Sequence, residues 1–393
     1  MRILFLTDNF PPEVNAPATR TYEHCKEWVK KGVDVTVITC APNFPEGKVY
    51  KGYKNKWLQR ETIDGIKVIR VWTYITANEG FIKRIVDYLS FMVAAFIAGL
   101  TVKTDTIIAT SPQFFTAVAG RWLSFWKRTP WVMEVRDLWP ESITAVGATK
   151  RNVVIRFFEW LEKRMYKSAS KIVVVTDSFA KILIEKHHIH SDKIKVIKNG
   201  ANLDLYQPQP KNQKLISNLG LENKFIIGYI GTHGMAHALD FVLYAAKSSS
   251  DPSVHFMLIG AGAKRKELLE LKNQLQLKNV TMLESISKTE VVQYTSILDV
   301  GLVNLKRSKT FHSVIPSKIF ELAAMHKPIL LGVEGESAAI VEQYQVGYTF
   351  IPEDQVDFFT KIEAIKTATF DFSRLLDDFD RKKLAVDMLY FIS

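Results

Sequence analysis

The sequence predicts an α/β fold made of two parallel-sheet domains, and three observations lead to that fold class. The chain has 393 residues, enough for two domains that each bury a core. In both halves, short apolar runs alternate with stretches of helical spacing, as in parallel sheets covered by helices on both faces. Between the halves, Asn199-Gly200 is followed by Pro208 and Pro210, a pattern typical of a linker.

The first half contains six apolar runs with the length of a buried strand. We expect strands at residues 2–7, 33–39, 66–72, 106–110, 131–135 and 171–176, separated by helices such as 19–31 and 153–167. A further segment, 81–100, ends in thirteen uncharged residues, fewer than the roughly 20 needed to span a bilayer. We expect it either to cover the sheet as a helix or to dip into a membrane interface.

The second half repeats this arrangement. Strands are expected at 225–231, 254–260, 280–283, 300–305 and 328–333, and helices begin near Ala236 and Pro316. An amphipathic pattern then runs from Phe372 to Ser393. Because ligands of parallel α/β sheets lie at the carboxyl ends of the strands, the loops after these strands are the candidate binding segments.

The positive charge of the chain is concentrated in its first half. Residues 1–200 carry 31 Lys and Arg against 19 Asp and Glu, whereas residues 201–393 carry 21 against 22. Basic residues mixed with tryptophan suit an anionic membrane surface, but they also suit RNA or DNA, or a plainly solvated surface. All eight tryptophans lie in this half: Trp28, Trp57, Trp72, Trp122, Trp126, Trp131, Trp139 and Trp160.

Cysteine usage favours a reducing compartment. Cys25 and Cys40 are the two cysteines of the chain, so no disulfide framework is expected. The apolar run within residues 1–10 is too short for a signal peptide and is expected to form the first strand.

Residues 297–355 have the pattern of a phosphate-binding unit, in which a strand, a basic loop, a helix and a second strand follow one another. A helix N-terminus beside a strand end receives phosphate, and a carboxylate one turn into the helix can accept hydrogen bonds from ribose hydroxyls. Glu321 stands at that position, which indicates a sugar-nucleotide site. An ordinary amphipathic helix with solvated charges is the alternative. The basic residues are Lys306, Arg307, Lys309 and Lys318.

These residues resemble the retaining glycosyltransferases of family 4, which have the GT-B fold. The family's signature is two glutamates eight positions apart; Glu321 matches the second, and Ser313 stands at the first. A bacterial O-antigen and capsule subgroup, similar to the N-acetylfucosamine-type transferases, looks alike through EVRDLWPE at residues 134–141. The resemblance implies Rossmann-like domains at 1–200 and 201–370 that face each other across a cleft. It also implies a terminal helix, 371–393, that returns to the first domain.

The resemblance also assigns roles in binding the donor. Glu321 is expected to hold the ribose, and the Ser313 hydroxyl remains available for a hydrogen bond. The loop Gly231-Thr232-His233-Gly234 is expected to approach the diphosphate through its glycines. Family members carry Arg and Lys near this loop, where this chain has Thr232, His233 and His237. We therefore expect the missing charge to come from among Lys306, Arg307, Lys309 and Lys318.

On the acceptor side, charged residues follow the strand at 131–135. Asp137 is expected to orient the acceptor hydroxyl, with Glu141 as the second candidate and Arg136 beside them. An ion pair of Arg136 with either carboxylate that only stiffens the turn is the alternative. The resemblance places the first loop, with Asn15 and Ala16, near diphosphate and acceptor. Arg20, in the first turn of the helix after this loop, is also a candidate; it is expected either to contact phosphate or to be a solvated helix residue.

The implied activity is retaining transfer of a sugar from a nucleoside diphosphate, UDP by family frequency. Cations and a helix N-terminus can stabilise the leaving diphosphate, so neither metal nor cofactor is expected; the nucleotide sugar is a substrate. The Asp-x-Asp sequence at 378–380 lies in the terminal helix pattern, away from the expected donor site. The expected acceptor is either lipid-linked, as in a saccharide on a polyprenyl diphosphate, or a saccharide without a lipid. The resemblance implies a cytoplasmic enzyme that lies at the inner face of the cell membrane.

Three other functions are compatible with parts of this pattern. A GT-B-type sugar-nucleotide epimerase would use the same donor site without an acceptor. A basic nucleic-acid-binding protein would explain the positive first half but gives Glu321 no role. A noncatalytic sugar-binding module would hardly need two domains.

Overall fold

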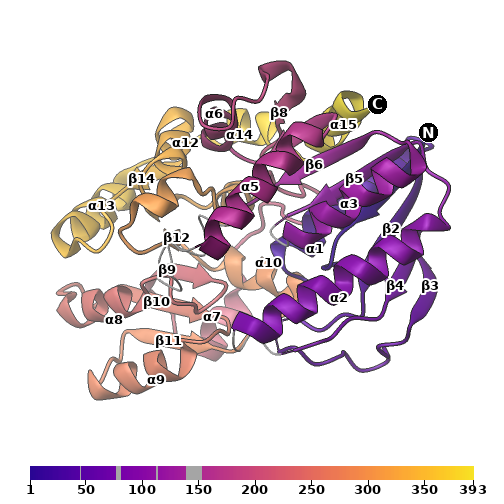
Figure 1. The fold of residues 1–393 in the computed structure, drawn as a ribbon. Helices are drawn as coiled ribbons and strands as arrows, with labels where there is room; N and C mark the ends of the chain where they lie inside the picture. Colours follow the sequence, from indigo (N-terminus) through magenta and orange to yellow (C-terminus); the bar gives the residue numbers. More distant parts are fainter. Residues whose placement is uncertain (45, 77–80, 112–113, 139–152) are drawn as a thin grey trace. The chain divides into compact units, whose positions relative to one another are not determined.

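Two β-sheets organise the computed structural model, and each belongs to its own unit of the chain (Figure 1). The structure describes residues 1–44, 46–76, 81–111, 114–138 and 153–393. One unit comprises Met1–Lys198 with Arg381–Ser393, and the other comprises Asn199–Asp380. Within the described ranges, no helix combines the length and the apolar character needed to cross a bilayer.

The sheet of the first unit is parallel except at one edge. Its strand order is β3-β4-β2-β1-β5-β6-β7-β8, and β3 runs antiparallel to β4. The sequence does not predict β3, because LQRETI alternates exposed and half-buried side chains and has no continuous apolar run. The strands are β1 (Arg2–Leu6), β2 (Asp34–Cys40), β3 (Leu58–Ile63), β4 (Ile66–Val71), β5 (Thr106–Thr110), β6 (Trp131–Val135), β7 (Lys171–Val174) and β8 (Ile194–Val196).

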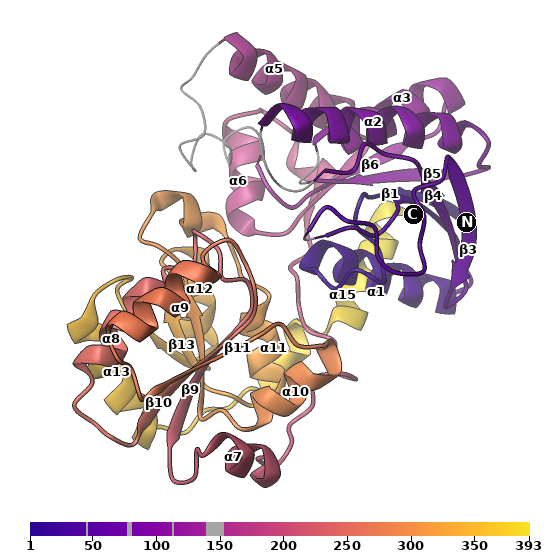
Figure 2. The same ribbon diagram turned by 90° about the horizontal axis from the view of Figure 1, so that it is seen from below.

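Helices cover both faces of this sheet (Figure 2). On one face Phe5 of β1 packs against Trp28, whose indole N–H donates a hydrogen bond to the Ala385 carbonyl at 2.7 Å. Leu4 and Leu6 point to the opposite face and its separate core. The first face carries α1 (Ala16–Lys30) and α15 (Arg381–Ile392); the second carries α2 (Phe81–Leu100), α3 (Phe114–Lys127) and α5 (Val153–Ser168). α6 (Asp177–Glu185) and the 3-10 helix η1 (Ser191–Lys193) lead to β8.

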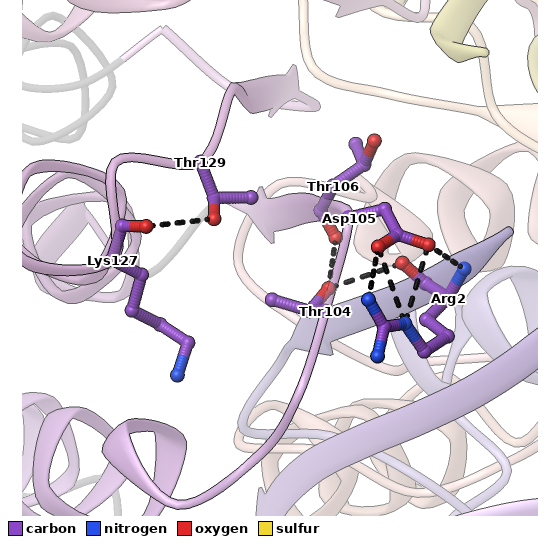
Figure 3. Close-up of polar contacts among 6 residues, drawn as sticks. All are labelled: Arg2, Thr104, Asp105, Thr106, Lys127 and Thr129. Carbon is purple, nitrogen blue, oxygen red and sulfur yellow. Dashed lines mark hydrogen bonds and ion pairs between the residues drawn. The ribbon is translucent and has the colours of Figure 1, made fainter.

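Polar contacts join the amino-terminal ends of β1 and β5 (Figure 3). The main-chain N–H of Arg2 donates to Asp105 Oδ2 at 2.8 Å, and the Thr104 hydroxyl donates to the Arg2 carbonyl at 3.1 Å. The Arg2 and Asp105 side chains are 46% and 44% exposed, so solvent screens the attraction between their charges. These contacts hold the two strands together at the ends opposite to those where a ligand of a parallel sheet binds.

The sheet of the second unit is parallel throughout, in the order β11-β10-β9-β12-β13-β14. The chain enters the sheet at β9, in its middle, and continues outward through β10 to β11. It then returns to the other side of β9 at β12, so the topological switch point lies between β9 and β12. The sequence does not predict the three-residue β14. The strands are β9 (Phe225–Ile230), β10 (Val254–Ile259), β11 (Val280–Leu283), β12 (Val300–Asn304), β13 (Ile329–Gly332) and β14 (Gly347–Thr349).

Most helices of this unit connect successive parallel strands. A core of buried side chains from β9, β10, β12 and β13 packs against α8 and α13. The helices are α7 (Gln213–Leu219), α8 (Leu239–Ser248), α9 (Arg265–Gln274), α10 (Lys288–Ser296), the 3-10 helix η2 (Lys309–Ser313), α11 (Lys318–Ala324), α12 (Glu336–Tyr344), α13 (Gln355–Thr367) and α14 (Ser373–Asp378).

The single amphipathic helix expected from Phe372 to Ser393 is two helices, α14 and α15, and each belongs to a different unit. The break lies at Phe379, whose carbonyl accepts a hydrogen bond from the Ala201 N–H at 3.0 Å. Its ring packs against Phe320, with ring centroids 4.7 Å apart. The helix thus ends where Phe379 contacts the linker and α11. Because these contacts involve residues far away in the chain, the local spacing of apolar residues does not predict the break.

Candidate functional site

The exit of β9 and the start of α11 meet at the switch point of the second sheet. Lys318, the first residue of α11, places its Nζ 3.7 Å from the centroid of the Tyr229 ring. A Cβ at Gly231 would overlap both Nζ and Cε of Lys318. Glycine at this position, where φ is 152°, therefore leaves the space that the ammonium group occupies.

The ammonium of Lys318 is in an environment that disfavours its charge. Burial lowers the pKa of Lys318 to about 7, although the Glu321 carboxylate one turn along α11 acts in the opposite direction. The face of the Tyr229 ring partly compensates through a cation–π interaction. A lysine poised in this way gains more from an anionic ligand than a solvated lysine does, because the ligand replaces missing solvation.

The loop after β9 is held by the neighbouring strand β12. The Asn304 side-chain amide donates to the carbonyls of His237 and Ala238, at 3.0 and 3.1 Å. The main-chain N–H of Lys306 donates to the Ala236 carbonyl at 2.8 Å. The loop between β9 and α8 is therefore positioned by backbone and buried polar contacts rather than by its own sequence.

Two histidines fill this loop where the resembled family has basic residues. Neither ring nitrogen of His233, which is 0% exposed, has a hydrogen-bond partner among the described residues, and the same holds for Nδ1 of His237. Both rings contact Tyr229, with centroids 6.1 and 5.9 Å away. Burial lowers the pKa of each histidine to about 4, so both are neutral near pH 7 and supply no cationic charge.

Of the four cations expected from sequence, the structure brings the Lys318 ammonium to this loop. The side chains of Lys306, Arg307 and Lys309 are exposed. Lys306 contributes its main-chain N–H, and the main-chain N–H of Arg307 donates to Glu353 Oε2 at 2.9 Å. Ser313, the residue at the position of the family's first glutamate, ends η2 and is half-buried.

Glu321 lies on the same helix as Lys318, half-buried and one turn further on. Both residues are among those that line a small cavity within the second unit. α11 has seven residues and begins at Lys318, two residues after the start expected near Pro316. The other residues lining the cavity are Tyr206, Gly228, Ile230, Val291, Thr295, Leu302 and Leu322.

In the first unit, the exits of β5 and β6 are joined through Ser111. Its hydroxyl oxygen accepts the main-chain N–H of Arg136 at 2.9 Å and that of Asp137 at 3.4 Å. Burial raises the pKa of Asp137 to about 6, with Arg136 acting in the opposite direction. Glu141, the second carboxylate expected from sequence, lies outside the described residues.

The exit of β1 adds a carboxylate that the sequence analysis missed. Asn15 donates through Nδ2 to Asn9 Oδ1 at 2.6 Å, and Asn9 donates through Nδ2 to Asp8 Oδ2 at 2.6 Å. Burial, followed by the charge of Glu13, raises the pKa of Asp8 to about 7. Its position directly after a buried strand was the available signal. Asn15 also caps α1, whose first residue, Ala16, is exposed.

Arg20 is neither solvated nor at the surface. Its side chain is 2% exposed, and Nε lies 2.9 Å from Oε1 of Glu134, which is 1% exposed. The two terminal nitrogens donate to the carbonyls of Lys198 and Ile197, at 2.7 and 2.9 Å. These contacts assign Arg20 a structural role that ties α1 to β6 and to the end of β8.

Known proteins match both units. Residues 15–200 match the glycosyl transferase 4-like domain, and residues 211–374 match the domain of glycosyl transferases group 1. The chain is 25% identical over 334 residues to the putative colanic acid biosynthesis glycosyl transferase WcaI of Escherichia coli (strain K12), covering 83% of this chain and 81% of that protein. It is 23% identical over 240 residues to the putative teichuronic acid biosynthesis glycosyltransferase TuaH of Bacillus subtilis (strain 168), covering 60% and 58%.

Solved structures with the same fold cover the whole chain. Alr3699/HepE of Anabaena, in complex with UDP and glucose, superimposes with a TM-score of 0.72 at 17% identity, covering 99% of this chain and 98% of that one. Sucrose-phosphate synthase of Thermosynechococcus elongatus gives 0.77 at 15% identity, with the same coverage. Both confirm the expected GT-B fold. The two domain matches span most of the sequence, and the chain therefore belongs to the glycosyltransferases that join a glycosyl transferase 4-like domain to a group 1 domain.

Proposed function

We propose that this glycosyltransferase moves a sugar from a UDP-sugar to a lipid-linked saccharide, with retention of configuration and without a metal, during synthesis of a bacterial surface polysaccharide. The position of Lys318 carries the proposal, because it puts an ammonium group beside Gly231 at the switch point of the second sheet, one turn from Glu321. The solved relative HepE binds UDP-glucose, which supports UDP as the nucleotide. The descriptions of WcaI and TuaH support a polysaccharide product.

In this proposal Lys318 binds the diphosphate and Glu321 binds the ribose hydroxyls. Negative charge grows on the diphosphate as the bond to the sugar breaks, and a fixed ammonium in a partly buried site stabilises it strongly. The main chain of Gly231 lies beside this ammonium, and the first turn of α8 receives no side-chain cap from Ala238. Ser313 lies close to α11 in sequence and is the candidate contact to the sugar.

On the acceptor side, Asp137 orients the acceptor for attack, and Arg136 adjoins it. The acceptor oxygen forms its bond to the anomeric carbon as the bond from that carbon to the phosphate oxygen breaks. The proton of the hydroxyl passes to the departing phosphate oxygen, so no carboxylate nucleophile is required. A lipid-linked acceptor would place this reaction at the cytoplasmic face of the membrane.

A binding screen followed by a transfer assay tests this function. The nucleotide sugar that binds should raise the melting temperature through mass action, so UDP, GDP, ADP and CMP sugars are compared first. Label from a UDP-sugar carrying a radioactive sugar should then move to the lipid fraction of a membrane extract, and the anomeric configuration of the product should match that of the donor. An epimerase would keep the label on the nucleotide. Stabilisation by none of the nucleotides would contradict the proposal.

Glu321→Gln is expected to weaken UDP binding by roughly 10- to 150-fold, because hydrogen bonds to a charged carboxylate are worth about 1.5–3 kcal/mol. Calorimetric titration of UDP into the purified variant measures this change. Glu270→Gln makes the same substitution on α9, where the side chain is 58% exposed, and should bind UDP as the unaltered protein does. Equal affinities for all three proteins would remove Glu321 from the ribose site.

Binding of UDP-glucose is expected to weaken as the pH rises above about 7. The pKa of Lys318 is about 7 without ligand, and a bound diphosphate should raise it, so binding takes up a proton above that pH. Affinity should be level below about pH 7 and fall by up to tenfold per unit above it. UDP-glucose is the suitable probe because its diphosphate diester does not titrate there. His233 and His237, with pKa values of about 4, stay neutral. A flat profile would exclude Lys318 as the titrating group.

A further inference from the structure

Three helices on one face of the first sheet expose large apolar side chains to solvent. On α3, Phe125 is 83% exposed and Trp126 is 69% exposed. On α5, Phe157 and Trp160 are 53% and 49% exposed, and their rings stack on one another. Side chains this large and this exposed on neighbouring helices mark an interaction surface in a water-soluble domain.

α2 continues this surface with an aliphatic stripe. Its exposed apolar residues are spaced three or four apart, which places them along one side of the helix, while Phe91 and Ala95 face the core. This answers the question left open by the sequence of 81–100, since the helix covers the sheet with one side and leaves an apolar side free. The stripe consists of Val86, Leu89, Val93 and Ile97.

Ring and polar contacts make the three helices one continuous surface. Phe96 of α2 meets Trp122 of α3 edge to face, with centroids 5.8 Å apart. Phe158 of α5 packs against Phe115 of α3 at 6.0 Å. Lys127 at the end of α3 donates to the Leu100 carbonyl of α2 at 3.0 Å. We call the exposed apolar side chains of α2, α3 and α5 the aromatic face.

The polar residues of these helices are mostly basic. α3 contains no acidic residue, and the acid of α2, Asp87, has its pKa raised to about 6 by burial. Glu162 of α5 is buried, with its pKa raised to about 8, which leaves Glu159 as the acid of α5 that is not buried. Arg164 lies over the Trp160 ring, 4.2 Å from its centroid. The basic residues are Lys83, Arg84, Arg121, Lys127, Arg156, Lys163, Arg164 and Lys167.

We propose that the aromatic face docks the protein on an anionic lipid bilayer, with aromatic and aliphatic tips at the level of the headgroups and the basic residues on lipid phosphates. Its use in delivering a lipid-linked acceptor rests on the proposed function, but the binding does not. Tryptophan beside arginine and lysine suits this interface, where each basic residue adds about fivefold to binding.

The charge and shape of the face favour a bilayer over other partners. A symmetric dimer through this face would press one basic surface against an identical one, which costs free energy. A single-stranded nucleic acid would use basic and aromatic side chains, but it would leave the aliphatic stripe of α2 without a partner. Anionic lipid satisfies the basic, the aromatic and the aliphatic groups together.

Flotation with lipid vesicles tests the proposal on the full chain. The unaltered protein should float with vesicles of phosphatidylcholine and phosphatidylglycerol, and weakly with phosphatidylcholine alone. Phe125→Ser with Trp126→Ser should lower partitioning by at least about tenfold, since two large apolar side chains no longer leave water. The matched control is Trp57→Ser with Trp72→Ser, an exposed stacked pair outside these helices, which should float normally.

A charge variant and a binding control complete the experiment. Lys163→Gln with Lys167→Gln should lower partitioning by about 25-fold and reduce its salt dependence. The melting temperature and its rise with UDP should stay unchanged in every variant, which separates docking from the donor site. The proposal would be overturned if the variant altered at Phe125 and Trp126 floated as well as the unaltered protein. It would also be overturned if these two residues were needed for a dimer or for an RNA complex. If the unaltered protein floats with anionic vesicles but transfers no sugar to the lipid fraction, the result counts against the proposed function and leaves the docking proposal standing.

Discussion

Lys318→Met is expected to weaken UDP binding by roughly 10- to 150-fold, because the substitution removes a charge that we propose hydrogen-bonds the diphosphate, an interaction worth about 1.5–3 kcal/mol. Methionine keeps most of the volume of lysine, so the space beside Gly231 stays filled. Turnover should fall further than affinity does, since the negative charge of the leaving group grows as the bond to the sugar breaks. Calorimetry with UDP and a single-turnover transfer assay measure the two effects.

The same substitution should leave the free protein at least as stable as before. Burial works against the charged form of Lys318, as its lowered pKa shows, and removing a disfavoured buried charge costs the fold nothing. Lys309→Met, on the exposed 3-10 helix η2, is the matched control and should change neither binding nor stability. If Lys309→Met weakens UDP binding as much as Lys318→Met does, a diffuse basic surface binds the diphosphate and the buried ammonium has no special role.

Arg20→Met is expected to lower the free energy of unfolding of the first unit by about 3–5 kcal/mol, because it leaves the buried carboxylate of Glu134 without its ion-pair partner. Two backbone carbonyls, of Ile197 and Lys198, lose their donors as well. Urea unfolding followed by tryptophan fluorescence measures this, since all eight tryptophans belong to residues 1–200. Lys26 lies on the same helix and makes an exposed ion pair with Asp64, in the turn between β3 and β4, so Lys26→Met should cost less than about 1 kcal/mol.

The loss caused by Arg20→Met should depend on pH. Burial alone would raise the pKa of Glu134, but the charges of Arg20 and Arg136 outweigh it and hold this pKa below its usual value. A carboxyl group with a lowered pKa in the folded state contributes stability above the unfolded pKa of about 4.3 and loses it as the pH falls. Without Arg20 we expect burial to raise the pKa of Glu134 above its unfolded value, so that Glu134 takes up a proton on folding. The loss of unfolding free energy caused by Arg20→Met should therefore become smaller as the pH falls. A deficit equal at all pH values would mean that packing, not charge, is what Arg20 provides.

Both substitutions concern residues that look alike in the sequence, a basic residue in the first turns of a helix. Lys318 projects toward a glycine and a ring at a strand exit, whereas Arg20 is closed in by Glu134 and two carbonyls. The first arrangement is poised for an anion and the second is already neutralised. Arg20 has an ion-pair partner at 2.9 Å and two carbonyl acceptors, whereas burial lowers the pKa of Lys318 despite the charge of Glu321, and this difference motivates the two opposite predictions.

The sequence by itself determined the α/β class and most strands, because a buried parallel strand must be apolar along its whole length and this pattern is local. The expected strand at 131–135 coincides with β6, and that at 280–283 with β11. The exposed edge strand β3 lacks such a run, and the three-residue β14 is too short to show one. The two terminal helices merge into one apparent pattern because the break at Phe379 coincides with contacts to distant residues.

The sequence also placed Glu321 and four basic residues near a phosphate-binding unit, but only the tertiary structure distinguished Lys318 from Lys306, Arg307 and Lys309. The distinction depends on Gly231 and Tyr229, which lie almost ninety residues away in the chain and meet Lys318 through the pairing of β9 with β12. The partners of Arg20 and the exposed rings of the aromatic face likewise come from packing. Burial is a property of the assembled fold, since it depends on which distant segments come to lie against a side chain.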